Sequence, residues 1–325
     1  MATQVTVTTG ARLHFGPLAA AGSGGGKFGG VGMMISAPGC IVTARPAERD
    51  SFVGDEVSVA RVAEFVRRIR AASPGETMTT AYEIDVRETI PAHSGLGSGT
   101  QLGLAVARAL SELSGERDVS VETLARRAGR GLRSAIGLHG FARGGFLVDG
   151  GRADQRDQLG TLVARHDFPS EWRLVLASPS QSSGLSGEDE LHAFAAQPPM
   201  SSTLTGELCR IVLMDWLPGL IEADFARVSS AMYEFGLVVG HFFEPVQGGV
   251  FAHPRMARLV EQLRACGVSG IAQTSWGPTL AVLCASEAEA HQLANDFALG
   301  GDWSDCEFRV VEPLNRGATV CVEQP

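Results

Sequence analysis

The chain has 325 residues, which is enough for about two domains of ordinary size. Hydrophobic residues make up 44% of it and charged residues 19%, so we expect a packed globular protein and no extensive disorder. The 27 basic and 36 acidic residues leave a net charge of −9, which argues against binding nucleic acid or anionic lipid through the overall field of the protein. We expect small-molecule substrates, and any anionic substrate must be held by local groups.

The sequence shows neither a targeting signal nor a membrane segment. Its start, MATQV, lacks the basic and apolar regions of a signal peptide, and charge interrupts the apolar stretches before they reach the length that a bilayer requires. The cysteines are scattered without a C-x-x-C pair, which is typical of reduced thiols. They are Cys40, Cys209, Cys266, Cys284, Cys306 and Cys321. We therefore expect a cytoplasmic protein without a membrane partner.

The first half of the chain shows alternating strand and helix patterns. Residues that alternate between apolar and polar predict strands, and apolar residues at helical spacing predict helices. In chain order we expect a strand near 5–8, an extended stretch at 33–44 interrupted by Pro38 and Gly39, a helix at 57–70, a strand at 82–86, a helix at about 100–113, a short basic helix at 121–130 and a strand at 144–150.

A charged segment at 152–158 predicts a boundary between two domains, 1–160 and 161–325. Beyond it we expect a strand at 172–177, helices near 203–214, 221–242 and 254–265, a strand or hairpin at 268–284, a helix at 286–298 and strands at 306–311 and 318–322. Alternating strands and helices predict an α+β layer fold in both halves, and about the last 70 residues resemble a split βαβ unit.

A glycine-rich loop lies between the strand at 82–86 and the helix that follows it. Residues 91–101 read PAHSGLGSGTQ. The free N–H groups of a first helical turn and the dipole of the helix attract phosphate, and Ser98 and Thr100 add hydroxyls. The loop lacks both the G-K-[ST] ending of a Walker loop and the G-x-G-x-x-G of a dinucleotide fingerprint. The pattern favours a phosphate site, and a capped helix start is the alternative.

This loop resembles the second motif of the GHMP superfamily, the group of galactokinase, homoserine kinase and mevalonate kinase. IAQTSWGPT at 271–279 resembles the third motif, and RLHFG at 12–16 occupies the place of the first. The three motifs follow the order of the superfamily across nearly the whole chain. The resemblance implies a two-domain α+β fold, with an N-terminal α/β domain that carries the phosphate loop and a C-terminal ferredoxin-like domain of the split βαβ type.

The sequence departs from the kinases of this superfamily at two positions. The kinases commonly carry S-G-x-D after the phosphate loop, where the aspartate is the base; here the stretch reads SAIG, with Gly137 in that place. Gly99 replaces a second serine of the loop. Loss of a general base typically costs a factor of about 10²–10⁴ in rate. Three phrases resemble instead the β-ribofuranosylaminobenzene 5′-phosphate synthases, a non-kinase branch: RSAIGLHGFARGGFLVDGG at 133–151, GLSGEDE at 184–190 and PVQGGVFAHP at 245–254.

The resemblance implies a pentosyltransferase of tetrahydromethanopterin biosynthesis. Such an enzyme joins phosphoribosyl pyrophosphate to 4-aminobenzoate or 4-hydroxybenzoate and releases an aryl C-riboside 5′-phosphate, carbon dioxide and pyrophosphate, with Mg²⁺ as cofactor. The sequence does not choose between the two benzoates and does not fix the oligomeric state, for which a homodimer is one alternative. An ATP-dependent GHMP small-molecule kinase and a non-catalytic sugar-phosphate sensor remain the competing functions.

The candidate site residues follow from this chemistry. The catalytic candidates are His14, His93, Arg133 and His139. The histidines would polarise the leaving group or hydrogen-bond the ring substituent, and the arginine would hold a substrate anion. The candidates for binding substrate or phosphate are Arg12, Lys27, Gly95, Gly97, Ser98, Gly99, Thr100, Arg143, Ser275 and Trp276. Trp276 would stack on the aromatic ring, with core packing as its alternative. Asp149 and Glu190 would hold Mg²⁺, and a turn is the alternative for both.

Overall fold

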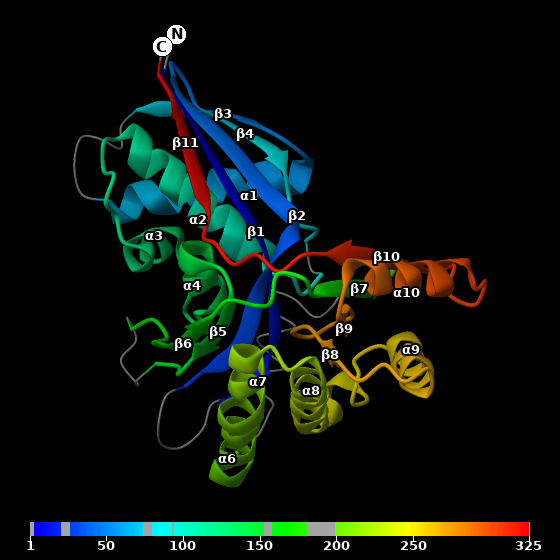
Figure 1. Cartoon of the computed structure of the whole chain (residues 1–325). Coiled ribbons are helices and arrows are strands. Elements are labelled where there is room, and N and C mark those ends of the chain that lie inside the picture. Colours follow the sequence, from blue (N-terminus) through cyan, green and yellow to red (C-terminus); the bar gives the residue numbers. More distant parts are fainter. Residues whose placement is uncertain are drawn as a thin grey trace.

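Two β-sheets with their helices organise the chain (Figure 1). The structure is a computed structural model that describes residues 3–20, 27–73, 80–92, 94–152, 158–180 and 199–324. The expected α+β fold is confirmed. Within the described residues no helix has the length and apolarity that a membrane crossing requires.

The larger sheet contains seven strands among the described residues. They are β1 (Gln4–Pro17), β2 (Gly30–Ala47), β3 (Ser51–Val53), β4 (Ala81–Glu88), β5 (Phe146–Asp149), β6 (Leu162–His166) and β11 (Thr319–Glu323). The order is β11-β1-β2-β4-β3, and β5 pairs with both β2 and β6. The expected break at Pro38 and Gly39 appears as a shift of register between β1 and β2, and β2 continues through it.

Four helices accompany this sheet: α1 (Glu56–Ala72), α2 (Ser98–Leu113), α3 (Val121–Ala128) and α4 (Ile136–Arg143). Helix α2 packs against β1 and β2, with α1, α3 and α4 around it. Helix α4 was not expected from the sequence, because its glycines have a low helix propensity. One of them, Gly140, has no room for a side chain because the Met34 sulfur lies where a Cβ would be.

The smaller sheet has the ferredoxin-like arrangement that the resemblance implied. Its strands are β7 (Arg173–Pro179), β8 (Ile271–Gln273), β9 (Leu280–Cys284) and β10 (Cys306–Val311), in the order β10-β7-β9-β8. The helices α6 (Ser202–Arg210), α7 (Leu217–Glu222), α8 (Phe225–Gln247) and α9 (Pro254–Ala265) connect β7 to β8, with a π-helical turn at Ile211–Trp216 between α6 and α7. Helix α10 (Glu287–Leu299) connects β9 to β10, which completes the split βαβ unit.

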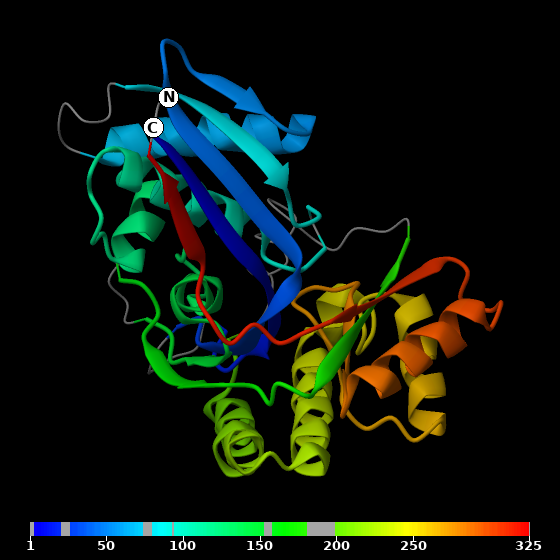
Figure 2. The ribbon, with the colours of Figure 1, turned by 45° about the horizontal axis from the view of Figure 1, so that its top comes forward.

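The last strand returns to the first sheet. Strand β11 runs antiparallel beside β1, with Gln4 opposite Glu323, and the two strands lie next to each other in both views of the ribbon (Figures 1 and 2). Strand β6 also belongs to the larger sheet. The domain limits 1–160 and 161–325 therefore do not separate the strands of the two sheets, although the second sheet lies wholly within the second range.

A fully buried tryptophan joins elements of both halves. The ring of Trp216 lies 5.1 Å from Phe15 of β1, 5.0 Å from Phe146 of β5 and 5.6 Å from Phe235 of α8, measured between centroids. Aromatic pairs at such distances add to the stabilisation that burial gives. This cluster fixes α8 against β1, and both elements supply walls of the cavity described below.

We expect Trp216→Ala to lower the free energy of unfolding by about 3–5 kcal/mol, because it leaves a large cavity among these rings. Urea denaturation followed by circular dichroism measures the change. Leu213→Ala, in the same π-helical turn but 55% exposed, is the control and should stay within about 0.5 kcal/mol of the wild type. Equal losses for the two variants would contradict the central role of Trp216.

Candidate active site

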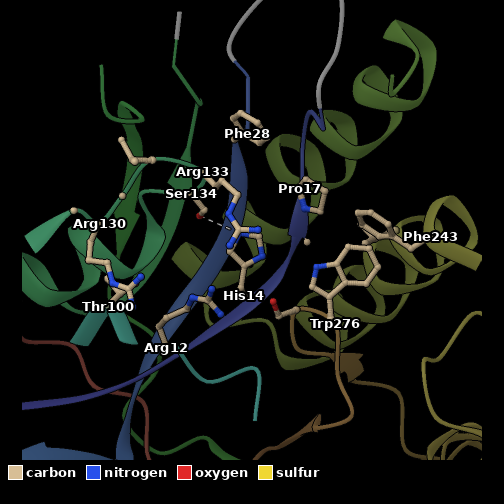
Figure 3. Close-up of a pocket in the computed structure, with 16 residues that line it drawn as sticks. Arg12, His14, Pro17, Phe28, Thr100, Arg130, Arg133, Ser134, Phe243 and Trp276 are labelled. Carbon is tan, nitrogen blue, oxygen red and sulfur yellow. Dashed lines mark hydrogen bonds between the residues drawn. The ribbon is translucent and has the colours of Figure 1, made fainter. Parts of the chain in front are cut away.

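A cavity of about 310 Å³ lies between β1, the α3–α4 loop, α8 and the turn that follows β8. Its lining differs from end to end (Figure 3). Arg12, Thr100 and Arg130 lie at one end, and Pro17, Phe243 and Trp276 lie at the other. His14, Ser134 and Arg133 lie between them. The cavity thus has a cationic end and an aromatic end.

Strand β1 supplies Arg12 and His14, which point to the same side because alternate residues of a strand share a face. The backbone N–H of Arg12 donates to the carbonyl of Leu96 at 3.0 Å, and its Nη1 donates to the carbonyl of Gly95 at 3.0 Å. These bonds attach the strand to the glycine loop and hold the guanidinium beside the start of α2.

The glycine loop ends in an uncapped helix. Gly97 is the N-cap of α2 in the left-handed conformation, with φ of 78°, and no side chain caps the helix. Among the described residues the capped-start alternative therefore does not apply to Ser98 or Thr100. Thr100 is the residue of this loop that lines the cavity.

The loop glycines make room for other parts of the protein. A Cβ on Gly97 would lie 2.7 Å from Cγ of Arg12, and one on Gly95 would lie 2.9 Å from the carbonyl oxygen of Thr274. The Arg130 guanidinium lies directly over Gly99, and its Nε donates to the Gly99 carbonyl at 3.0 Å. The loop is thus packed beneath two arginines, and the guanidinium groups form the cationic end of the cavity.

The turn after β8, which carries the third motif, packs against the glycine loop and β1. The Thr274 hydroxyl accepts from the N–H of His14 at 3.1 Å and donates to the Gly95 carbonyl at 3.2 Å. The N–H of Ser275 donates to the His14 carbonyl at 2.6 Å, and Ser275 has a positive φ of 54°. Trp276 is buried against Phe243, with ring centroids 4.6 Å apart, and still lines the cavity.

His14 is a neutral hydrogen-bonding group. Its Nε2 lies 3.1 Å from Oγ of Ser134, which also accepts from the N–H of Ile136 at the start of α4. Burial first, and the charge of Arg12 second, lower the pKa of His14 to about 3. The imidazole is therefore uncharged near neutral pH, and a role for it in catalysis stays a prediction.

The cationic end of the cavity carries positive charge from its arginines. Burial, followed by repulsion from Arg61, Arg68 and Arg133, lowers the pKa of Arg130 to about 10, so its guanidinium is still protonated near neutral pH. Among the described residues no aspartate or glutamate lines the cavity. Such a surface favours an anionic ligand even though the whole chain is acidic.

Arg12, His14, Thr100, Arg133, Ser275 and Trp276 were expected from the sequence and line the cavity together. Arg130, Ser134, Phe28 and Phe243 also line it, and the sequence reasoning missed them. The stretch GRGLRS at 129–134, with a glycine on each side of Arg130, is the signal that could have identified two of the four.

Three expected site residues have structural roles away from the cavity. His139 is buried and its Nε2 lies 2.8 Å from the Gly160 carbonyl. Asp149 is fully buried, and its carboxylate accepts from the N–H groups of Ala135 at 2.7 Å and Gly151 at 2.8 Å. Arg143 is exposed at the end of α4. The structure thus places His139, Arg143 and Asp149 outside the lining of this cavity, and the roles expected for them stay predictions.

Lys27 does not line the cavity; its backbone pairs with that of Arg152 beside β2 and β5. His93 and Glu190 lie outside the described residues. Within the part of the chain that the structure describes, no group of three histidine, cysteine, aspartate or glutamate side chains could hold a metal ion.

Comparison with known proteins identifies the family to which this chain belongs. The model for "GHMP kinases N terminal domain" matches residues 58–144, and the model for "GHMP kinases C terminal" matches residues 216–300. The fold resembles that of homoserine kinase from Cytophaga hutchinsonii, with a TM-score of 0.68 at 17% identity over 98% of this chain and 97% of that one. Mevalonate pyrophosphate decarboxylase from Streptococcus pyogenes gives a TM-score of 0.66 at 14% identity over 97% and 98% of the two chains. The two family matches and the fold thus define this chain as a protein of the GHMP type.

Two relatives narrow the family further. The β-ribofuranosylphenol 5′-phosphate synthase of Archaeoglobus fulgidus is 32% identical over 96% of this chain and 98% of its own length. The enzyme of the same name from Methanothermobacter thermautotrophicus is 29% identical over 86% and 88% of the two chains. The chain belongs to the β-ribofuranosylphenol 5′-phosphate synthase family and is an enzyme of the transferase class.

The low pKa of His14 predicts a pH-dependent stability. Below about pH 6.5 the unfolded chain protonates His14, whereas the folded protein resists protonation down to about pH 3, so stability falls as the pH decreases through this window. We expect the wild type to lose about 2 kcal/mol more than His14→Gln between pH 7 and pH 5. Urea midpoints at the two pH values measure this difference.

His291→Gln on α10, where the histidine side chain is 59% exposed, is the matched control. Between pH 7 and pH 5 this variant should lose as much stability as the wild type. If His14→Gln also loses stability as the wild type does, the imidazole is not held neutral by the fold.

Proposed function

We propose that this enzyme transfers the phosphoribosyl group of phosphoribosyl pyrophosphate to the ring of a para-substituted benzoate, with release of carbon dioxide and pyrophosphate, in tetrahydromethanopterin biosynthesis. The observation that carries the proposal is the cavity with one cationic and one aromatic end. The product named for the relatives, a ribofuranosylphenol 5′-phosphate, joins these two chemistries in one molecule.

The cationic end suits the donor. Arg12 and Arg130, with Arg133 in the middle of the cavity, can donate charge-assisted hydrogen bonds to phosphate oxygens, and Thr100 lies at the same end as Arg12 and Arg130. Arginine is well suited to this task because its planar fork of N–H groups matches the oxygens of a phosphate. When the bond between the ribose C1 and the pyrophosphate breaks, its electron pair leaves with the pyrophosphate, and fixed positive charge stabilises that charge as it develops.

The aromatic end suits the acceptor. Phe243 and Trp276, together with Pro17 and Val239, form an apolar wall on which a benzene ring can lie. The ring carbon that bears the carboxylate attacks C1 of the ribose, assisted by electron donation from the para substituent. Its bond to the carboxylate then breaks, the electron pair returns to the ring and restores aromaticity, and carbon dioxide leaves.

No net proton transfer occurs in this reaction, and the residues between the two ends agree with that. His14 is neutral, and Ser134 hydrogen-bonds to it and to the backbone of α4. These groups can orient the ribose or the carboxylate without acting as acid or base. Positioning and stabilisation of the leaving group then supply the catalysis.

The geometry also agrees with direct displacement. The donor carries its pyrophosphate on the α face of the ribose, and the relatives are named for a β product. Inversion at C1 requires the ring to approach from the side opposite the pyrophosphate. A cavity with its cationic groups at one end and its aromatic groups at the other allows that arrangement.

Two features favour this function over a kinase. A Cβ at Gly137, where the kinases commonly carry their base, would lie 3.2 Å from Cγ2 of Thr100, so an aspartate there would require Thr100 to shift slightly, and it would also contact Arg12 at 3.6 Å. Arg130 and Arg12 also cover the glycines of the loop. The likeness to homoserine kinase concerns the fold alone.

The phenol in the names of the relatives favours 4-hydroxybenzoate over 4-aminobenzoate as the acceptor. We propose that Mg²⁺ enters with the phosphates of the donor, since Mg²⁺ commonly binds substrate phosphates and keeps several of its waters. The cytoplasmic location and the homodimer stay predictions.

We expect carboxyl-labelled 4-hydroxybenzoate or 4-aminobenzoate to release labelled carbon dioxide only when phosphoribosyl pyrophosphate is present with Mg²⁺. Scintillation counting of the released gas measures turnover, and reactions with ATP in place of the donor are the control. Turnover of ATP with an alcohol acceptor, without release of carbon dioxide, would favour a kinase. Tight binding of the donor without any turnover would favour a sensor.

We expect Arg133→Ala to lower kcat/KM for the donor by about ten- to a hundredfold, because a charge-assisted hydrogen bond to an ionised substrate contributes about 1.5–3 kcal/mol. The melting temperature should change little, since Arg133 is exposed on its loop. Arg133→Lys should restore only part of the rate. Arg67→Ala, on an exposed side chain paired with Glu64, is the control. If the alanine variants behave alike, Arg133 does not bind substrate.

A further inference from the structure

Three guanidinium groups converge on the first turn of α2. The Arg12 side chain packs on Gly97, Nη1 of Arg61 donates to Oγ of Ser98 at 3.3 Å, and Nε of Arg130 donates to the Gly99 carbonyl at 3.0 Å. Each of three successive residues of the turn therefore touches a different arginine. These arginines come from β1, α1 and the segment that follows α3, so the fold assembles the group from distant parts of the sequence.

This arrangement is electrostatically unfavourable in the absence of an anion. The first turn of a helix carries partial positive charge, and here no side chain caps it. Arg61, Arg68 and Arg133 all repel Arg130. The nearby carboxylate of Glu64 bonds to Arg67 and Arg68 on its own helix. Among the described residues no carboxylate forms a salt bridge with Arg61 or Arg130.

The positive surface extends beyond the cavity. Arg130 lines the cavity, whereas Arg61 and Ser98 do not. Arg130 thus lies between two regions, with the cavity on one side and Arg61 of α1 on the other. A monophosphate at the cationic end can contact Arg12 and Arg130, which line the cavity, whereas an anion with two linked phosphates can continue from Arg130 toward Arg61. Contact with Arg61 would therefore favour a diphosphate over a monophosphate.

We propose that Arg61 binds the terminal phosphate of the leaving pyrophosphate, while Arg130 contacts both the inner and the terminal phosphate. This inference rests on the proposed function for the source of the diphosphate. The electron pair of the breaking bond at C1 of the ribose goes to the inner phosphate, and the two arginines stabilise the charge that spreads over the released pyrophosphate. Arg61 exchanges its hydrogen bond with the Ser98 hydroxyl for one with a phosphate oxygen.

Isothermal titration calorimetry with inorganic pyrophosphate and with ribose 5-phosphate tests the assignment on the full chain. We expect Arg61→Ala to weaken pyrophosphate binding by about ten- to a hundredfold and to leave ribose 5-phosphate binding within about twofold. Arg61→Lys should recover part of the affinity for pyrophosphate. Arg67→Ala is the matched control, because it removes the same charge from the same helix at an exposed position and should change neither affinity.

Equal pyrophosphate affinities for Arg61→Ala and Arg67→Ala would overturn the proposal and leave Arg61 with a structural contact to Ser98. Equal losses of affinity for pyrophosphate and ribose 5-phosphate would overturn it as well. They would mean that Arg61 attracts any anion through its charge and does not bind a particular phosphate. Titration with ATP and with phosphoribosyl pyrophosphate shows whether the linked phosphates that bind here come from a nucleotide or from the ribose donor. Tighter, Arg61-dependent binding of ATP than of phosphoribosyl pyrophosphate would assign the cluster to a nucleotide and overturn the proposal.

The two proposals can fail separately. If Arg61→Ala selectively weakens pyrophosphate binding while no carbon dioxide is released from labelled benzoate, the diphosphate site stands and the proposed reaction falls. If carbon dioxide is released and Arg61→Ala binds pyrophosphate as the wild type does, the reaction stands and the role of Arg61 falls.

Discussion

The Thr274 hydroxyl is the contact on which the site depends. It accepts from the N–H of His14 and donates to the carbonyl of Gly95, so one buried side chain joins β1, the glycine loop and the turn after β8. A buried hydroxyl that uses both its donor and an acceptor position fixes its partners in one relative position. Through these bonds the cationic end, the neutral imidazole and the aromatic end of the cavity are held together.

Positive charge is concentrated where the helix dipole already favours an anion. The protein has a net charge of −9, yet Arg12, Arg61 and Arg130 meet at the first turn of α2. Burial first, and repulsion from neighbouring arginines second, lower the pKa of Arg130, so its charged form is held in unfavourable surroundings in the folded protein. A bound phosphate would relieve this repulsion, so part of the affinity for an anionic substrate is prepared by the fold itself.

The same fold serves different reactions because few side chains decide the chemistry. The overall fold resembles those of homoserine kinase and mevalonate pyrophosphate decarboxylase at 17% and 14% identity. In this chain Gly137 lies against Thr100 and Arg12, and two arginines cover the loop glycines. Helix α8 and the turn after β8 supply the aromatic wall of the cavity, so one end of the cavity is apolar and the other is cationic.

The sequence by itself determined the local elements, the position of the glycine-rich loop before α2 and the family. Strand alternation, helical spacing and a glycine-rich helix start are local properties, so β4, α1, α2 and α10 lie close to where they were expected. Tertiary structure alone decided that β11 returns to β1, that Arg61 and Arg130 meet at Ser98 and Gly99, and that His14 lines the cavity while His139 does not. The physical reason is that burial and the pairing of distant segments set these roles, and no pattern within one short segment records them.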